Sequence, residues 1–86
     1  MTLDNLRAEI DAVDDELAAL LARRMDLAAR VAAIKRETGM PVFRPARERA
    51  ILERLGARIE PQYLSALQTI YEAIFRASRA YQEGLI

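Results

Sequence analysis

The chain has 86 residues, of which 52% are hydrophobic and 30% are charged, as expected for one small globular domain over residues 1–86. Its 13 basic and 13 acidic residues cancel, which argues against a nucleic-acid partner bound through bulk positive charge. The absence of cysteine and histidine excludes disulfides, Cys or His metal sites, and Ser-His or Cys-His catalysis. We expect no metal and no cofactor, and a chemistry that uses carboxylates, hydroxyls, amides, arginine and lysine.

The sequence gives no indication of targeting or of membrane insertion. Residues Met1 to Asn5 are acidic rather than basic and are not followed by the apolar stretch of a signal peptide. The longest apolar run, Leu17 to Ala22, is much shorter than the roughly 20 residues that cross a bilayer. We therefore expect a cytoplasmic protein with no membrane partner.

The first predicted helix spans about 35 residues, which corresponds to roughly 50 Å. Thr2 or Asp4 is a suitable N-cap, and Thr38, Gly39 and Pro41 end the pattern. An apolar stripe runs along it in steps of three and four, formed by Leu3, Leu6, Ile10, Val13, Leu17, Leu20, Arg24, Leu27, Val31 and Ile34. A compact chain of this length has a radius of gyration of only about 12 Å, so this helix needs a partner.

Two shorter helices follow a connector over residues 40–45. One begins at Pro45 and stops at Gly56, with Ile51, Leu52 and Leu55 on its apolar side. The other opens at Pro61 and runs to about Glu83, and its stripe, again in steps of three and four with Ser78 as the polar exception, is Leu64, Leu67, Tyr71, Ile74, Ser78 and Tyr81. The predicted fold is all-α, with a long, a short and a medium helix, assembled as an intertwined homodimer.

Cationic side chains fall at informative positions on the first helix. Arg24 interrupts its apolar stripe, which indicates a residue that sets the register, a snorkelling side chain, or a cation lining an anion pocket. Lys35, the single lysine among the 13 bases, lies about 20° from Arg24 around the helix and roughly 16 Å further along it. Arg7 is about 42 Å from Lys35, so it reaches the same ligand only from an antiparallel partner. Taken singly, Lys35 and Arg7 are also compatible with ordinary solvated residues.

Four polar residues on the shorter helices are further candidates. Arg47 and Glu48 lie in the first turn of the second helix, where an acid also complements the helix dipole. Ser78 and Gln82 are four residues apart and share one face of the third helix. Each has an ordinary structural explanation, such as back-bonding of the serine hydroxyl or solvent exposure of the glutamine. Each of these candidate residues is a weak indication of a functional site by itself, but all of them together in one chain are a specific one.

The combined pattern resembles the all-helical chorismate mutases, which are intertwined homodimers of three-helix subunits. The resemblance covers almost the whole chain, in residues 6–11 (LRAEID), 20–25 (LLARRM), 31–35 (VAAIK), 47–49 (RER) and 78–82 (SRAYQ). It implies that the protein converts chorismate to prephenate in aromatic amino acid biosynthesis, with a dianionic substrate and active sites shared between subunits. This Claisen rearrangement requires no nucleophile and no proton transfer, which suits a chain without histidine or cysteine.

The resemblance also implies a role for each candidate residue. Lys35 and Gln82 would face the ether oxygen of the substrate, and Glu48 would accept a hydrogen bond from the ring hydroxyl. The two carboxylates of the substrate would be held by Arg24, Arg47, Ser78 and by Arg7 of the other subunit. The resemblance also implies that Arg44 binds the substrate through its backbone N–H. Some members of the family carry an acid at this position, and the difference is harmless if only the backbone acts; a role of the side chain would alter affinity or inhibition by charged ligands.

Two alternatives remain at this point. Isochorismate pyruvate-lyases share the fold and most of the cationic pocket, and residues 23–26 (RRMD) resemble them too. Residues 47–49 favour the mutase. A non-catalytic dimerisation module would explain the apolar stripe of the first helix. It would not explain why Arg24 and Ser78 interrupt two separate stripes.

Overall fold

The computed structural model describes residues 1–86, which form three α-helices and one short 3-10 turn. The helices are α1 (Leu3–Thr38), α2 (Pro45–Gly56) and α3 (Leu64–Leu85), and the 3-10 turn η1 (Pro61–Tyr63) leads directly into α3. The prediction of an all-α fold with a long, a short and a medium helix is confirmed. The third helix differs slightly from its predicted bounds, because its first turn is 3-10 and its end lies at Leu85.

Local signals set both ends of α1. The Thr2 hydroxyl accepts a hydrogen bond from the backbone N–H of Asn5 at 3.1 Å, so Thr2 rather than Asp4 is the N-cap. Gly39 ends the helix with φ of 73°, in the left-handed region that glycine adopts at little cost. Pro45 occupies the first turn of α2, as predicted.

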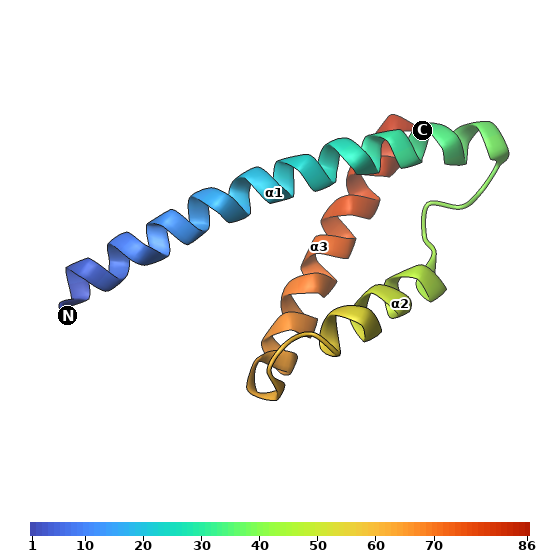
Figure 1. Cartoon of the computed structure of the whole chain (residues 1–86). Helices are drawn as coiled ribbons and strands as arrows, with labels where there is room; N and C mark the ends of the chain where they lie inside the picture. Colours follow the sequence, from blue (N-terminus) through green and yellow to red (C-terminus); the bar gives the residue numbers. More distant parts are fainter.

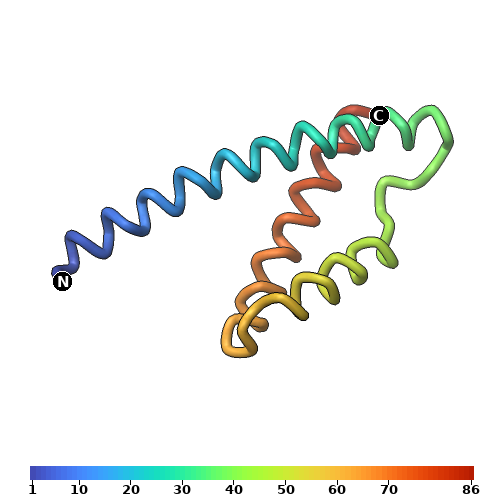
Figure 2. The backbone as a smooth tube through the Cα atoms, in the orientation of Figure 1, coloured from blue at the N-terminus to red at the C-terminus, as the bar shows by residue number.

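Figures 1 and 2 show that α3 crosses obliquely from the end of α2 to the C-terminal half of α1, and it packs against both helices. The N-terminal half of α1 extends away from the rest of the chain. The principal extents are 54 × 25 × 16 Å, and the radius of gyration is 15.8 Å. A compact chain of this length would have about 12 Å. None of the three helices contains an apolar segment of the length that a bilayer requires.

The buried faces of the helices differ from the predicted stripes. On α1 the buried residues are Ala28, Ala32 and Lys35, while the apolar members of the α1 stripe are between 42% and 61% exposed. The small alanines let α3 approach α1 closely. On α3 the buried residues are Phe75, Ser78 and Gln82, so Ser78 is the one member of the α3 stripe that is buried within the chain, while Leu64 and Tyr81 are exposed. The α3 surface is apolar over more than one face, and periodicity alone does not select the one that packs.

Candidate active site

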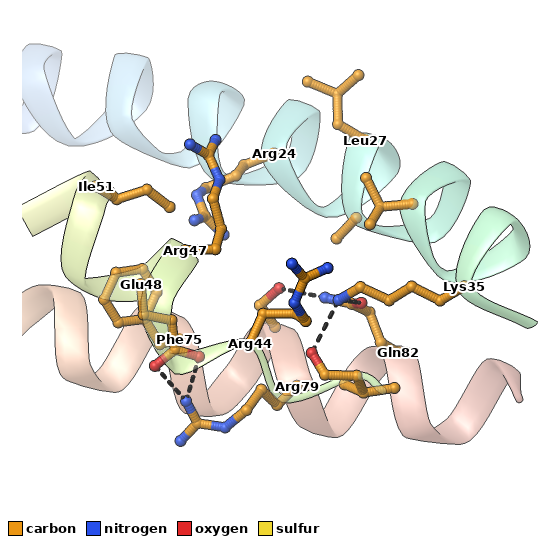
Figure 3. A pocket seen from close by; sticks show the side chains of 14 residues that line it. Arg24, Leu27, Lys35, Arg44, Arg47, Glu48, Ile51, Phe75, Arg79 and Gln82 are labelled. Carbon is orange, nitrogen blue, oxygen red and sulfur yellow. Dashed lines mark hydrogen bonds and ion pairs between the residues drawn. The ribbon is translucent and has the colours of Figure 1, made fainter. Parts of the chain in front are cut away.

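A cavity of about 270 Å³ lies between the three helices and the connector that joins α1 to α2. Figure 3 shows the ammonium of Lys35 and the guanidinium groups of Arg24, Arg44 and Arg47 turned toward this space. The charged lining residues are Arg24, Lys35, Arg44, Arg47, Glu48 and Arg79. Ser78 and Gln82 add polar groups, and the apolar part is formed by Leu27, Ala28, Val31, Val42, Ile51 and Phe75.

Lys35 is the most constrained of these cations. Lys35 is 9% exposed, and its Nζ donates hydrogen bonds to the Val42 carbonyl at 2.8 Å and to Gln82 Oε1 at 2.9 Å. Gln82 Nε2 donates in turn to the Ser78 hydroxyl at 3.1 Å. An ammonium has three N–H donors and a side-chain amide has two, so Lys35 and Gln82 each retain a donor for a ligand.

The surroundings of Lys35 disfavour its positive charge. Burial lowers its pKa below the usual 10.5, and the charge of Arg44 lowers it further, while Glu48 opposes the shift. A bound anion would replace the lost hydration of the ammonium. The site is therefore prepared for a negatively charged ligand at Lys35.

The arginines of the cavity lie on different elements. Arg24 is half-buried on α1 with its guanidinium 5.9 Å from the centre of the Phe75 ring, and no carboxylate pairs with it. Arg47 lies in the exposed first turn of α2. Arg44 is the N-cap residue of α2, and its carbonyl accepts the N–H of Glu48 at 3.1 Å.

Glu48 is the one carboxylate of the cavity, and it is paired. Arg79 Nη1 donates to Glu48 Oε1 at 2.7 Å and to Oε2 at 2.6 Å. The sequence predicts no role for Arg79, because Glu48 and Arg79 lie 31 positions apart on different helices. No helical periodicity links residues on two different helices, and the only sequence signal for Arg79 is its place within residues 78–82.

The chain brings seven of the eight predicted site residues to one cavity: Arg24, Lys35, Arg44, Arg47, Glu48, Ser78 and Gln82. Burial of Gln82 contrasts with the exposure that its type alone favoured. Arg7 is exposed on the projecting half of α1 and does not line the cavity. It lies 17 residues, or about 25 Å along the helix, from Arg24. Within one chain, Arg7 is remote from this site.

The cavity therefore combines five cations with one paired carboxylate in a small space, which suits a compact anion. A family model described as chorismate mutase type II matches residues 6–83. The chain belongs to this family. Because the match runs from the first turn of α1 to the last turn of α3, it includes every residue of the cavity.

Three relatives illustrate the family. The chain is 35% identical over 80 residues to the T-protein of Haemophilus influenzae, covering 91% of this chain and 21% of that protein. It is 43% identical over 53 residues to the bifunctional chorismate mutase/prephenate dehydratase of Aquifex aeolicus, and this match covers 62% of this chain and 15% of that protein. It is 40% identical over 74 residues to the 4-amino-4-deoxychorismate mutase of Streptomyces venezuelae, and this match covers 84% of this chain and 72% of that protein. The chain thus spans about a fifth or less of the T-protein and of the bifunctional enzyme.

Proposed function

We propose that this chain catalyses the Claisen rearrangement of chorismate to prephenate. Membership of the type II chorismate mutase family supports the proposal. The observation that carries it is the buried Lys35–Gln82 pair, which retains two donors beside arginines without carboxylate partners. The proposal places the activity in aromatic amino acid biosynthesis, consistent with a relative whose name joins chorismate mutase to prephenate dehydratase. A cytoplasmic location remains part of the proposal.

The proposed mechanism uses placed charges and no proton transfer. Arginine forks at Arg24 and Arg47, with the Ser78 hydroxyl, hold the two carboxylates so that the substrate adopts its compact reactive conformer. One C–C bond forms while the ether C–O bond breaks. Lys35 and Gln82 donate to the ether oxygen, where negative charge grows in the transition state. Glu48 accepts the ring hydroxyl, and Arg44 contributes its backbone N–H.

The active unit in this proposal is an intertwined homodimer. Only eight of 86 residues are buried within one chain, and the apolar residues of the α1 stripe stay between 42% and 61% exposed. An exposed apolar surface that runs along a whole helix is typical of an interface. An antiparallel copy of α1 covers this stripe, and it also brings Arg7 of each subunit toward the cavity of the other.

We expect the purified protein to sediment as a dimer at micromolar concentration. Leu17, in the middle of the α1 stripe and 50% exposed, provides the test. Leu17→Glu places a charge where the two helices pack, so it should dissociate the dimer and reduce activity together. Glu16→Gln, one position away and outside the stripe, is the control and should leave the dimer intact. A monomeric wild-type protein would contradict the proposed assembly.

The activity should fall at alkaline pH because Lys35 must be protonated to carry its positive charge. Burial lowers the pKa of Lys35 below its usual value of 10.5. The value of kcat/KM, which reports ionisations of the free enzyme, should therefore begin to fall at a lower pH than it would for a fully solvated lysine. Gln82 does not ionise near neutrality, so position 82 should cause no fall in activity as pH rises from about 5 to 8. The profile is measured on the wild type and on Lys35→Arg, whose charge persists to higher pH. An unchanged alkaline limb in Lys35→Arg would assign the decline to another group.

The direct test of the function is the loss of chorismate absorbance with identification of the product. Prephenate as the product supports the proposal. Isochorismate is assayed in parallel, because the lyase activity would use the same cationic cavity. Cleavage of isochorismate without formation of prephenate from chorismate would replace the mutase by the lyase.

A further inference from the structure

The carboxylate of Glu48 is held by a residue that the proposed mechanism does not use. Arg79 on α3 donates through one nitrogen to both Glu48 oxygens, at 2.7 and 2.6 Å, and this is the one ion pair of the structure (Figure 3). The side chains of Arg79 and Glu48 are only 30% and 22% exposed. Partial removal from water makes this pair stronger than an ordinary surface ion pair.

Arg79 is itself fixed from a third segment. Its guanidinium carbon lies 4.9 Å from the centre of the Phe43 ring, which belongs to the connector between α1 and α2. A cation over an aromatic face is attracted to it, so Phe43 restricts the orientation of Arg79. Phe43, Arg79 and Glu48 thus join the connector, α3 and α2, and they fix the position of the only carboxylate in the cavity.

The pairing decides what Glu48 offers to a ligand. A carboxylate accepts about four hydrogen bonds, and Arg79 uses one on each oxygen, so Glu48 still accepts from a hydroxyl. Its charge, however, is compensated by Arg79, and Lys35, Arg44 and Arg47 add further positive charge to the cavity. A neutral donor is accepted beside Glu48. A cationic donor is repelled by the net positive surroundings.

We propose that Arg79 is a positioning residue that sets substrate choice, by making the site prefer a ring that carries a hydroxyl over one that carries an ammonium. The inference rests on the proposed function, which places the ring hydroxyl of chorismate at Glu48. Without Arg79, Glu48 loses its one ion-pair partner, and its carboxylate is then free to pair with an amine, which is protonated at neutral pH as a lysine side chain is. Arg79 therefore acts on specificity through Glu48 rather than on the breaking bond.

The experiment compares kcat/KM for chorismate and for 4-amino-4-deoxychorismate, in which an amine replaces the hydroxyl. Arg79→Met should shift the ratio of the two values toward the amine by about 10-fold, the effect of one hydrogen bond to a charged group. Arg79→Lys restores the charge and most of the preference for chorismate. Arg79→Gln serves if the methionine variant does not fold. The matched control is Arg76→Met, which removes an exposed arginine three positions earlier on α3 that forms no ion pair with Glu48.

The ratio separates a role in specificity from a structural one. A structural role would lower both kcat/KM values equally, and an Arg79→Met ratio equal to that of Arg76→Met would overturn the inference. In a Glu48→Gln background, Arg79→Met should no longer change the ratio, because its effect passes through Glu48. A wild-type protein that does not rearrange chorismate would reject the proposed function itself, which is a different result from an unchanged ratio.

Discussion

Replacing Lys35 with alanine should lower kcat for chorismate rearrangement by about 10²–10³-fold, the usual effect of removing one donor to a developing oxyanion. Negative charge on the ether oxygen is larger in the transition state than in the bound substrate. Loss of the ammonium therefore affects kcat as well as KM. Lys35 is the only lysine, and no neighbouring amine replaces it.

The fold should tolerate this change better than catalysis does. Lys35→Ala leaves the Val42 carbonyl and Gln82 Oε1 without their donor, which costs about 1–3 kcal/mol per unsatisfied group. It also removes a charge whose burial is unfavourable, as its lowered pKa indicates. Lys35→Gln is the matched variant, since it keeps a donor without the charge. Thermal unfolding monitors the fold, and a folded Lys35→Ala protein with kcat within about threefold of wild type would remove Lys35 from the mechanism.

Arg7→Ala should lower kcat/KM by about 100-fold, because it removes a charge-assisted hydrogen bond to a substrate carboxylate. The effect is expected even though Arg7 lies on the projecting half of α1, outside its own cavity. The control on the same helix is Arg36→Ala, an exposed arginine in the last turn that should keep wild-type activity. Steady-state kinetics on both variants measures the difference.

Mixing two inactive variants tests whether the site is shared. When Arg7→Ala and Lys35→Ala chains refold together, about half of the dimers contain one chain of each kind. In such a dimer one site receives the intact Arg7 and the intact Lys35, and the other receives both defects. About one quarter of wild-type activity should therefore return. Activity that stays at the level of the separate variants would show that Arg7 and Lys35 do not serve one site across the dimer.

The helices could be predicted from the sequence because their signals are local. Thr2, Gly39 and Pro45 act on backbone groups within a few residues, and their effects do not depend on the rest of the fold. The face that α3 buries could not be predicted in the same way. Ile74 and Phe75 are adjacent and both apolar, and only packing against α1 and α2 makes Phe75 the buried one.

In the candidate site, too, features within one helix could be predicted from the sequence, and contacts between helices could not. Arg24 and Lys35 share one helix, so the helical period alone predicts that they face the same side, and both line the cavity. The ion pair between Glu48 and Arg79 joins two helices, and its formation depends on how those helices cross. Residue types and spacing on each helix contain no information about that crossing.

The sequence by itself determined the three helices, the long unpartnered apolar stripe, and a set of charges without histidine or cysteine. Only the tertiary structure decided how those charges differ from one another. Arg24 lies unpaired at the cavity, Arg79 is neutralised by Glu48, and the pKa of Lys35 is lowered mainly by burial. The physical reason is that electrostatic interactions depend on distance and on exclusion of water, and packing between residues remote in sequence sets both.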